Sequence, residues 1–352
     1  MQPPLHPPRK TLAQLALLLA GIAIAVAGGE AVCRVAFSES PWNPGPQVHA
    51  VQAQLRLEPD CGFIWKASIA YTNNVVLAWN DIVPEPLSTD RLGFRNLPDA
   101  MTARAGGRPI DVLGVGDSFM HDASYFLYRF FRERGLLYYN MAMHRYCPPQ
   151  YNVVLSKYGL PQKPGLVLYG LFENDFLETA DYGLWRSSGL DWFTYHSGTW
   201  GGPPLCLSRT EVWFRTHLPG CYTPYRSFLA KHAEDDFARR HAAAAVREVE
   251  QCIMEAFDDA RSAGVGFLLV LIPSKQTTSA KGVSEWSPAY DLIVSAMRRR
   301  DVPVLDLRDV FARCGRFPGD LFQRADDHWN ESGMGVAAEA IYRFAGRFAA
   351  AP

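Results

Sequence analysis

Short apolar runs alternate with amphipathic stretches from residue 108 to the C-terminus, and the two patterns predict strands and helices in turn. Runs of this length, bounded by glycine, proline or polar residues, are typical of buried parallel strands. The predicted strands are residues 110–115, 136–141, 166–172, 266–272 and 302–307. Helical spacing marks the stretches around and between them, at residues 125–134, 150–158, 228–263, 289–300 and 331–349.

This alternation predicts an α/β fold with three layers, αβα, around a flavodoxin-like parallel sheet of about five strands. Right-handed crossovers bring the carboxyl ends of all parallel strands to one edge of the sheet, where sites form. We expect this main domain to cover residues 109–350. Residues 181–224 form an aromatic, glycine-rich insertion, too long for an ordinary connection, which predicts a functional lid or a disordered segment. Its aromatic side chains can stack on sugar rings or form the small core of a structural flap; they are Trp185, Trp192, Phe193, Tyr195 and Trp200.

The N-terminal third has a different pattern of apolar and polar residues. Residues 1–10 are proline-rich and end in Arg9-Lys10, and an apolar run broken only by Gln14 follows. The run is long enough for a transmembrane helix at residues 11–29, and the basic pair places residues 1–10 in the cytoplasm and the body outside. A cleaved signal peptide is the competing interpretation, because Ala25-Val26-Ala27 has the form of a cleavage site; a buried core helix is the third.

We predict that residues 38–108 form an irregular, partly β region, with strand-like runs at 67–71 and 74–78.

Composition and charge narrow the class of partner. The 352 residues carry 35 basic and 36 acidic side chains, and no run of Lys or Arg stands out. A nucleic-acid partner is therefore not expected. Seven cysteines without a CxxC pair argue against a zinc or thioredoxin-type site. Outside the cytosol, Cys206 and Cys221 are the best candidates for a disulfide.

The first chemical signal is Gly116-Asp117-Ser118-Phe119, directly after the first predicted strand and before a helix. A serine there lies at the carboxyl edge of the sheet, where the N–H groups of a helix N-terminus can hold a developing oxyanion. The competing interpretation is that Asp117 or Ser118 only caps the helix.

The second signal is Asp326-Asp327-His328 before the last helix. Histidine can take the proton of a serine hydroxyl because its pKa lies near neutrality, and a carboxylate can hold its tautomer. In an extended loop Asp326 points the same way as His328 and Asp327 points away. Asn330 is a natural N-cap for the helix that follows.

A third signal, Glu173-Asn174-Asp175, ends the third predicted strand. The amide of Asn174 can donate to an oxyanion, or Asn174 can be an ordinary turn residue.

In this order and spacing, the motifs resemble those of the SGNH (GDSL-type) hydrolase superfamily. Ser118 matches the nucleophile, Asn174 the oxyanion asparagine and His328 the general base. The form of residues 326–333, with Asp326 two before the histidine, resembles membrane-anchored bacterial members, as do residues 89–96. The resemblance covers most of the chain from Arg108, apart from residues 181–224.

One position departs from the family pattern. The second block of the family usually reads Asn-x-x-x-x-Gly, and counting from Asn140 the glycine position holds Arg145. Arg145 keeps the backbone N–H, but its side chain can crowd the substrate, alter the backbone or meet an anionic substrate such as a uronic-acid polymer.

The resemblance implies a carboxylic-ester hydrolase on the periplasmic side of a bacterial inner membrane, held by its single N-terminal helix. Ser118, His328 and Asp326 form the catalytic set, and the oxyanion is held by Ser118, Asn174 and Arg145, without a cofactor. The expected substrate is a glycan carrying O-acetyl or other short acyl groups. Three alternatives remain: an O-acyltransferase for exported polysaccharide, a non-catalytic glycan-binding subunit, and a lipid-directed esterase.

Overall fold

The computed structural model describes residues 9–36, 54–68, 88–196, 219–278, 284, 286–323 and 327–349. The chain divides into two units. One is Met1–Pro46 with Pro204–Asp236, and the other is Gln47–Pro203 with Phe237–Pro352. The second unit holds the sheet and every candidate site residue.

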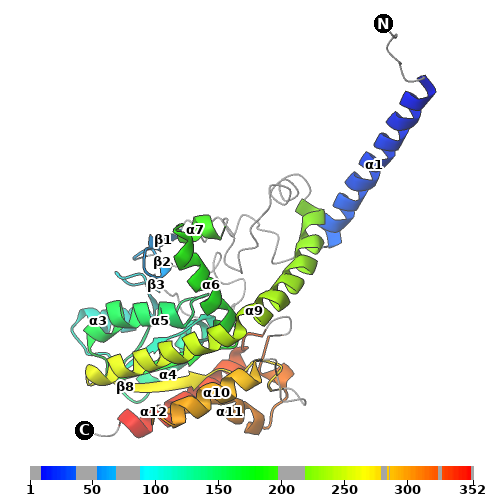
Figure 1. Cartoon of the computed structure of the whole chain (residues 1–352). Coiled ribbons are helices and arrows are strands. Elements are labelled where there is room, and N and C mark those ends of the chain that lie inside the picture. The colour runs from blue at the N-terminus through cyan, green and yellow to red at the C-terminus, as the bar shows by residue number, and fades with distance from the viewer. Residues whose placement is uncertain are drawn as a thin grey trace. The chain divides into compact units, whose positions relative to one another are not determined.

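A five-stranded sheet forms the centre of this unit (Figure 1). All neighbouring strands are parallel, and their order is β6-β5-β7-β8-β9. This is the flavodoxin-like order, in which the strand sequence reverses between β5 and β7. The five predicted strands are confirmed, with slightly shorter bounds: β5 Val112–Val115, β6 Tyr138–Asn140, β7 Leu166–Leu171, β8 Gly266–Leu271 and β9 Val304–Asp306.

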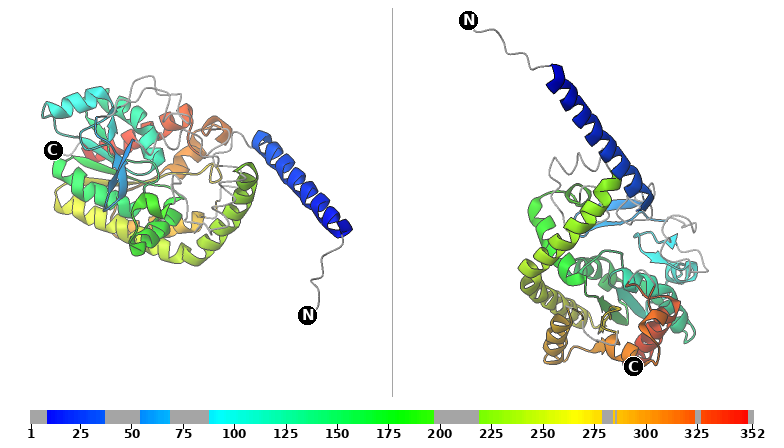
Figure 2. Two further views of the ribbon diagram at one scale, coloured as in Figure 1. Left: turned by 90° about the horizontal axis from the view of Figure 1, so that it is seen from above. Right: turned by 90° about the vertical axis from the view of Figure 1, so that its right-hand side faces the viewer.

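Helices cover both faces of the sheet. α4 (Ser118–Arg132) and α12 (Glu331–Ala349) pack against each other, and α4 lies on β5 and β6. α5 (Pro148–Val154) and the second half of α9 (Pro219–Ser262) lie on the other face, where the Asn152 amide donates to the carbonyl oxygen of Cys252 over 2.8 Å. Figure 2 shows α12 and this half of α9 on opposite sides of the sheet. The predicted αβα layers are therefore present.

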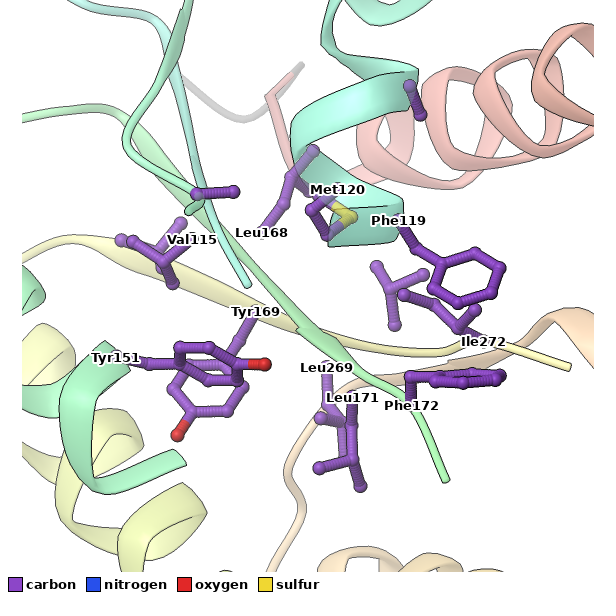
Figure 3. Close-up of a cluster of buried hydrophobic side chains, with 14 of the residues drawn as sticks. Val115, Phe119, Met120, Tyr151, Leu168, Tyr169, Leu171, Phe172, Leu269 and Ile272 are labelled. Atoms are coloured by element: carbon purple, nitrogen blue, oxygen red, sulfur yellow. The ribbon is translucent and has the colours of Figure 1, made fainter. Parts of the chain in front are cut away.

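Strand β7 shows how the two layers are built. Its side chains alternate between the faces, so Leu168 points toward Met120 of α4, and Tyr169 points toward Tyr151 of α5 (Figure 3). The rings of Tyr151 and Tyr169 meet edge to face with centroids 5.3 Å apart. Every residue of β7 is buried, as expected of a central parallel strand.

The predicted helix at 150–158 is confirmed by α5 together with a π turn, Leu155–Gly159, that continues it. Helices absent from the sequence prediction fill several connections, beginning with a 3-10 turn at Leu160–Gln162. A second 3-10 turn is Pro318–Asp320. α10 (Ser287–Arg298) matches its prediction to within two residues. The unpredicted helices are α3 Pro98–Ala105, α6 Asp175–Ser188, α7 Trp192–Tyr195 and α11 Leu307–Arg313.

The first part of the predicted insertion is ordered by aromatic packing. α6 runs into it and α7 follows, and the rings of Trp185 and Trp192 meet with centroids 5.1 Å apart. Both tryptophans are buried, and Trp192 also packs on Phe63. These two rings are therefore packed inside the protein. Residues 197–218 lie outside the described part of the chain.

Two small hairpins precede the sheet. β1 (Leu55–Glu58) pairs antiparallel with β2 (Gly62–Trp65), and β3 (Ser88–Thr89) pairs with β4 (Arg95–Asn96). Predicted strand 67–71 is not formed at residues 67 and 68, which are a turn. The rest of that run and the run 74–78 lie outside the described residues.

In the other unit, α1 (Arg9–Ala36) covers the predicted transmembrane segment. Among the residues that the structure describes, however, none of the helices combines the length and apolar character needed to cross a bilayer. The predicted anchor is therefore not confirmed. The predicted Cys206–Cys221 disulfide falls outside the residues whose side chains are described. Within the described part, Cys61, Cys147, Cys252 and Cys314 are free thiols.

Candidate active site

Ser118 is placed by a sharp strand-to-helix turn at the end of β5. Gly116 has φ +155°, and a Cβ there would lie 2.6 Å from Cγ of Met120, so only glycine lets the first turn of α4 pack this closely. Asp117 is the N-cap, and its Oδ1 accepts from the N–H of Phe119 over 3.0 Å. α4 begins at Ser118, whose own N–H therefore has no partner within the helix. The cap is Asp117, which leaves the Ser118 hydroxyl available.

His328 is held by a short loop before α12. The carbonyl oxygen of His328 accepts from the N–H of Gln323 over 2.8 Å. Phe322 and Trp329 form an isolated antiparallel β-bridge. The Trp329 ring is fully buried. Asn330 Oδ1 accepts from the N–H of Gly333 over 3.1 Å, which confirms the predicted N-cap. The backbone from His328 to the start of α12 is therefore held by hydrogen bonds and by the buried Trp329 ring.

The fold brings these two side chains into contact across 210 positions of sequence. His328 Nε2 lies 2.7 Å from Ser118 Oγ. The Phe119 ring stacks on the imidazole, with centroids 4.7 Å apart and an angle of 11° between the planes. Ser118 is buried and His328 is half-buried. The distance suits proton transfer from the serine hydroxyl to the imidazole.

Asp326, the predicted partner of His328 Nδ1, lies outside the described residues. Its orienting role stays a prediction from the sequence. Asp327 is described and exposed.

The loop after β6 carries Arg145 along the same edge of the sheet. The N–H groups of Met141 and Met143 donate to the carbonyl oxygens of Gly114 and Gly116 over 2.7 and 3.0 Å, so the loop follows β5 toward the serine. Arg145 has φ +61°, in the left-handed region that favours glycine. The backbone therefore has the conformation expected of a glycine position, although the residue is arginine.

Asn174 follows β7 at this edge and immediately precedes α6. It lies in a turn, in which the N–H of Asp175 donates to the carbonyl oxygen of Phe172 over 3.1 Å, and its side chain does not cap α6. The Oδ1 atom is buried without a hydrogen-bond partner. The side chain of Asn174 hydrogen-bonds Glu178, one turn later.

Three acids at Asp117 and close to it have raised pKa values that were not predicted; Asp117 and Asp175 are buried and Glu178 is half-buried. Burial raises the pKa of Asp117 to about 7, although the charge of His328 acts to lower it. Burial also raises the pKa of Glu178 to about 8, against the lowering effect of Arg145. The pKa of Asp175 is raised by burial and by the negative charge of Asp117, and its carboxylate accepts from the Tyr151 hydroxyl over 2.6 Å. Sequence alone gives no signal for these shifts, since they depend on tertiary burial.

A second polar cluster lies one turn beyond the serine. His121 and Asp122 belong to α4, and His144 lies on the loop beside Arg145. Burial is the largest single effect on the Asp122 carboxyl and acts to raise its pKa, but the charges and hydrogen bonds of His144 and His121 together outweigh it and lower the pKa. His121 and Asp122 stand three and four positions after Ser118, so their helical proximity was visible in the sequence; the approach of His144 was not.

Residues 232–347 match the model of a protein family described as SGNH hydrolase-like domain, acetyltransferase AlgX. This segment includes His328 but neither Ser118 nor Asn174, and it is less than half of the chain. It confirms the resemblance to SGNH hydrolases and says nothing of membrane anchoring. No curated protein matches the chain.

Several solved structures are similar in part. A putative lipolytic protein of the G-D-S-L family from Desulfitobacterium hafniense is 12% identical, with TM-score 0.40 over 67% of this chain and 99% of that one. An α/β hydrolase from the metagenome of Lake Arreo is 16% identical, with TM-score 0.41 over 67% and 95%. A catalytic mutant of an acetylxylan esterase from Geobacillus stearothermophilus is 12% identical, with TM-score 0.39 over 67% and 93%. Likeness at this level carries no conclusion about function.

Proposed function

From the match of residues 232–347 to the SGNH hydrolase-like family, we propose that this chain is a serine enzyme that acts on acyl esters, with Ser118 as nucleophile. One observation carries the proposal: His328 Nε2 lies 2.7 Å from Ser118 Oγ at the carboxyl edge of a parallel sheet. A serine hydroxyl becomes a useful nucleophile only when a base of this kind accepts its proton.

The first half of the reaction forms an acyl-enzyme. Ser118 Oγ attacks the ester carbonyl carbon while its proton moves to His328 Nε2. The carbonyl oxygen becomes an oxyanion, which we assign to the N–H groups of Ser118 and Arg145 and to the Asn174 amide. When the C–O bond to the leaving alcohol breaks, that oxygen takes the proton from His328.

In the second half, water or another alcohol gives its proton to His328 and attacks the acyl group, and Oγ of Ser118 regains the proton. Water yields a carboxylic acid, and an alcohol yields a new ester. We propose hydrolysis of acetyl or other short acyl esters on a glycan as the activity. Transfer of the acetyl group to a glycan hydroxyl is the second candidate, favoured by the acetyltransferase in the family description.

The orienting acid in this proposal is Asp326, because it stands two positions before His328 in the sequence. The placement outside a bacterial inner membrane rests likewise on Arg9, Lys10 and the apolar run after them. Protease accessibility of the body of the chain in intact spheroplasts tests that placement: digestion is expected, and protection would contradict it.

Turnover of an activated acetyl ester and of an acetylated oligosaccharide tests the function. The wild-type chain is expected to release acetate, and Ser118→Ala to abolish release. Ser156→Ala, a substitution at an exposed serine, is the matched control and is expected to retain it. Adding a deacetylated oligosaccharide separates the two candidates, because transfer requires acetylated acceptor to form faster than free acetate. Activity that survives Ser118→Ala would refute the proposal, and binding of the glycan without turnover would favour a non-catalytic subunit.

A further inference from the structure

The cluster of His121, Asp122 and His144 is separate from the serine–histidine pair. His121 Nδ1 lies 3.2 Å from Asp122 Oδ1, and His144 Nε2 lies 3.3 Å from the same oxygen. The two imidazole rings meet edge to face with centroids 4.2 Å apart. One potential ligand atom from each residue lies within 4.8 Å of the other two. Two helix residues and one loop residue thus converge on one point.

We propose that His121, Asp122 and His144 bind a divalent transition metal ion, with Zn²⁺ the best fit. Two imidazoles and one carboxylate are a common ligand set for this ion, with bonds of about 2.0–2.2 Å. Tetrahedral geometry then separates the ligand atoms by roughly 3.3 Å. Both separations from Asp122 Oδ1, 3.2 and 3.3 Å, match that spacing, and the ligand atoms of the two histidines lie within 4.8 Å of each other. The separations from Asp122 Oδ1 lie at the long end of ordinary N–H···O hydrogen bonds, which cluster near 2.9–3.0 Å.

Burial supports the same assignment. The His121 side chain is fully buried, and its Nε2 has no hydrogen-bond partner. Among the described residues, its Nδ1 has only the 3.2 Å contact to Asp122, which a metal bond at Nδ1 would replace, and the ring proton would then lie on Nε2. His144 is partly exposed, with 23% of its side chain accessible, and it offers a route for the ion to enter. Three protein ligands leave a fourth position open.

Charge predicts what fills that position. The Asp122 carboxylate is the one acidic ligand, and the positive charge of Arg95 acts on His121. A bound dication would leave the cluster with net positive charge. We therefore expect an anion such as hydroxide or a small carboxylate at the open position.

The ion would join two parts of the candidate active site. His121 and Asp122 lie on α4, one turn after Ser118, and His144 is adjacent to Arg145 on the loop after β6. A bond from both segments to one ion would fix the left-handed Arg145 backbone relative to the serine. The three ligands are therefore positioning residues in this inference, and metal binding does not depend on the proposed ester chemistry.

Direct binding of Zn²⁺ and Co²⁺ to the chelator-treated full chain tests the site. We expect one equivalent to bind with micromolar or tighter affinity, and Co²⁺ to show the visible absorption of a tetrahedral complex. Asp122→Asn and His144→Gln should weaken binding by more than roughly 10-fold. His144→Gln alters a partly exposed side chain, so circular dichroism should show a folded protein even if Asp122→Asn does not fold.

His241→Ala is the matched control, because His241 is a half-buried histidine on α9 that does not belong to the cluster, and it should bind as the wild type does. Absence of stoichiometric binding by the wild type would overturn the inference. Equal binding by wild type, His144→Gln and His241→Ala would overturn it as well. A wild-type chain that binds the metal but does not turn over esters would count against the proposed function and would still support the metal site.

Discussion

Replacement of Gly333 by alanine should disturb the loop that carries His328. Gly333 lies in the first turn of α12, where an added Cβ would fall 2.1 Å from the carbonyl oxygen of Leu321 and 3.1 Å from Cβ of Trp329. Ordinary contacts begin at 3.4 Å. The Leu321 carbonyl is backbone and already accepts from the N–H of Asn330 over 3.0 Å, so it cannot turn away. The first turn of α12 must therefore move relative to residues 321–330.

Two effects are expected of Gly333→Ala, a lower free energy of unfolding and a slower reaction at Ser118. Forcing a methyl group into a packed site typically costs about 1–3 kcal/mol of unfolding free energy. A displacement of about 1 Å at a catalytic group can slow its reaction by about 100-fold. Gly335, two positions later in the same helix, has nothing within 4 Å of an added Cβ. Gly335→Ala should therefore be neutral or stabilising by about 0.5–1 kcal/mol, since alanine favours the helix.

Urea unfolding measures the stability of Gly333→Ala and Gly335→Ala. The rate at which a serine-reactive fluorophosphonate labels Ser118 measures how well His328 activates the serine. The first variant should lose stability and label slowly, and the second should match or exceed the wild type. If both variants unfold and label alike, the packing of α12 against the Leu321 carbonyl does not position His328.

Three further substitutions test the buried groups around the site. Because burial raises the pKa of Asp117 from 3.8 to about 7, the native state keeps a proton that the unfolded chain releases, and the free energy of unfolding should fall as pH rises between those values. Asp117→Asn keeps the acceptor for Phe119 and should lose less stability than wild type between pH 5 and pH 8 in urea titrations; equal losses would contradict the shift. Arg145→Gly should label at Ser118 at least as fast as wild type, because glycine adopts the positive φ without strain, and a loss above 10-fold would show that the side chain is needed. Tyr151→Phe removes the donor to buried Asp175 and should cost about 1–3 kcal/mol in urea unfolding, whereas an unchanged midpoint would rule out that contribution.

The strands were predictable because each is a short apolar run buried on both faces. The helices were predictable where the apolar spacing is sustained, as in Glu331–Ala349. α6 was missed because its sequence mixes Gly183 and several polar residues, and the helix depends on tertiary burial of Phe176 and Trp185. α3 and α11 are too short for spacing alone to distinguish them from loops.

Those residues of the candidate site that lie at the carboxyl edge of the parallel sheet were predictable from the sequence. Ser118 and His328 follow strands or precede helices at the carboxyl edge, so the parallel sheet brings them together. An arginine gives no local signal for the left-handed conformation of Arg145, and only the glycine of the family pattern at this position indicated it. The raised pKa values of Asp117 and Glu178 and the approach of His144 to Asp122 depend on packing between distant segments, which spacing does not encode.

The most direct test of the central claim is covalent labelling of the folded full chain by a fluorophosphonate, read by intact mass and peptide mapping. A phosphonate of this kind reacts with a serine that a neighbouring base activates. We predict one adduct, on Ser118, that is absent in Ser118→Ala, strongly reduced in His328→Gln and unchanged in Ser156→Ala. A folded wild-type chain that takes up no adduct, or one whose labelling is unaffected by His328→Gln, would contradict an activated Ser118.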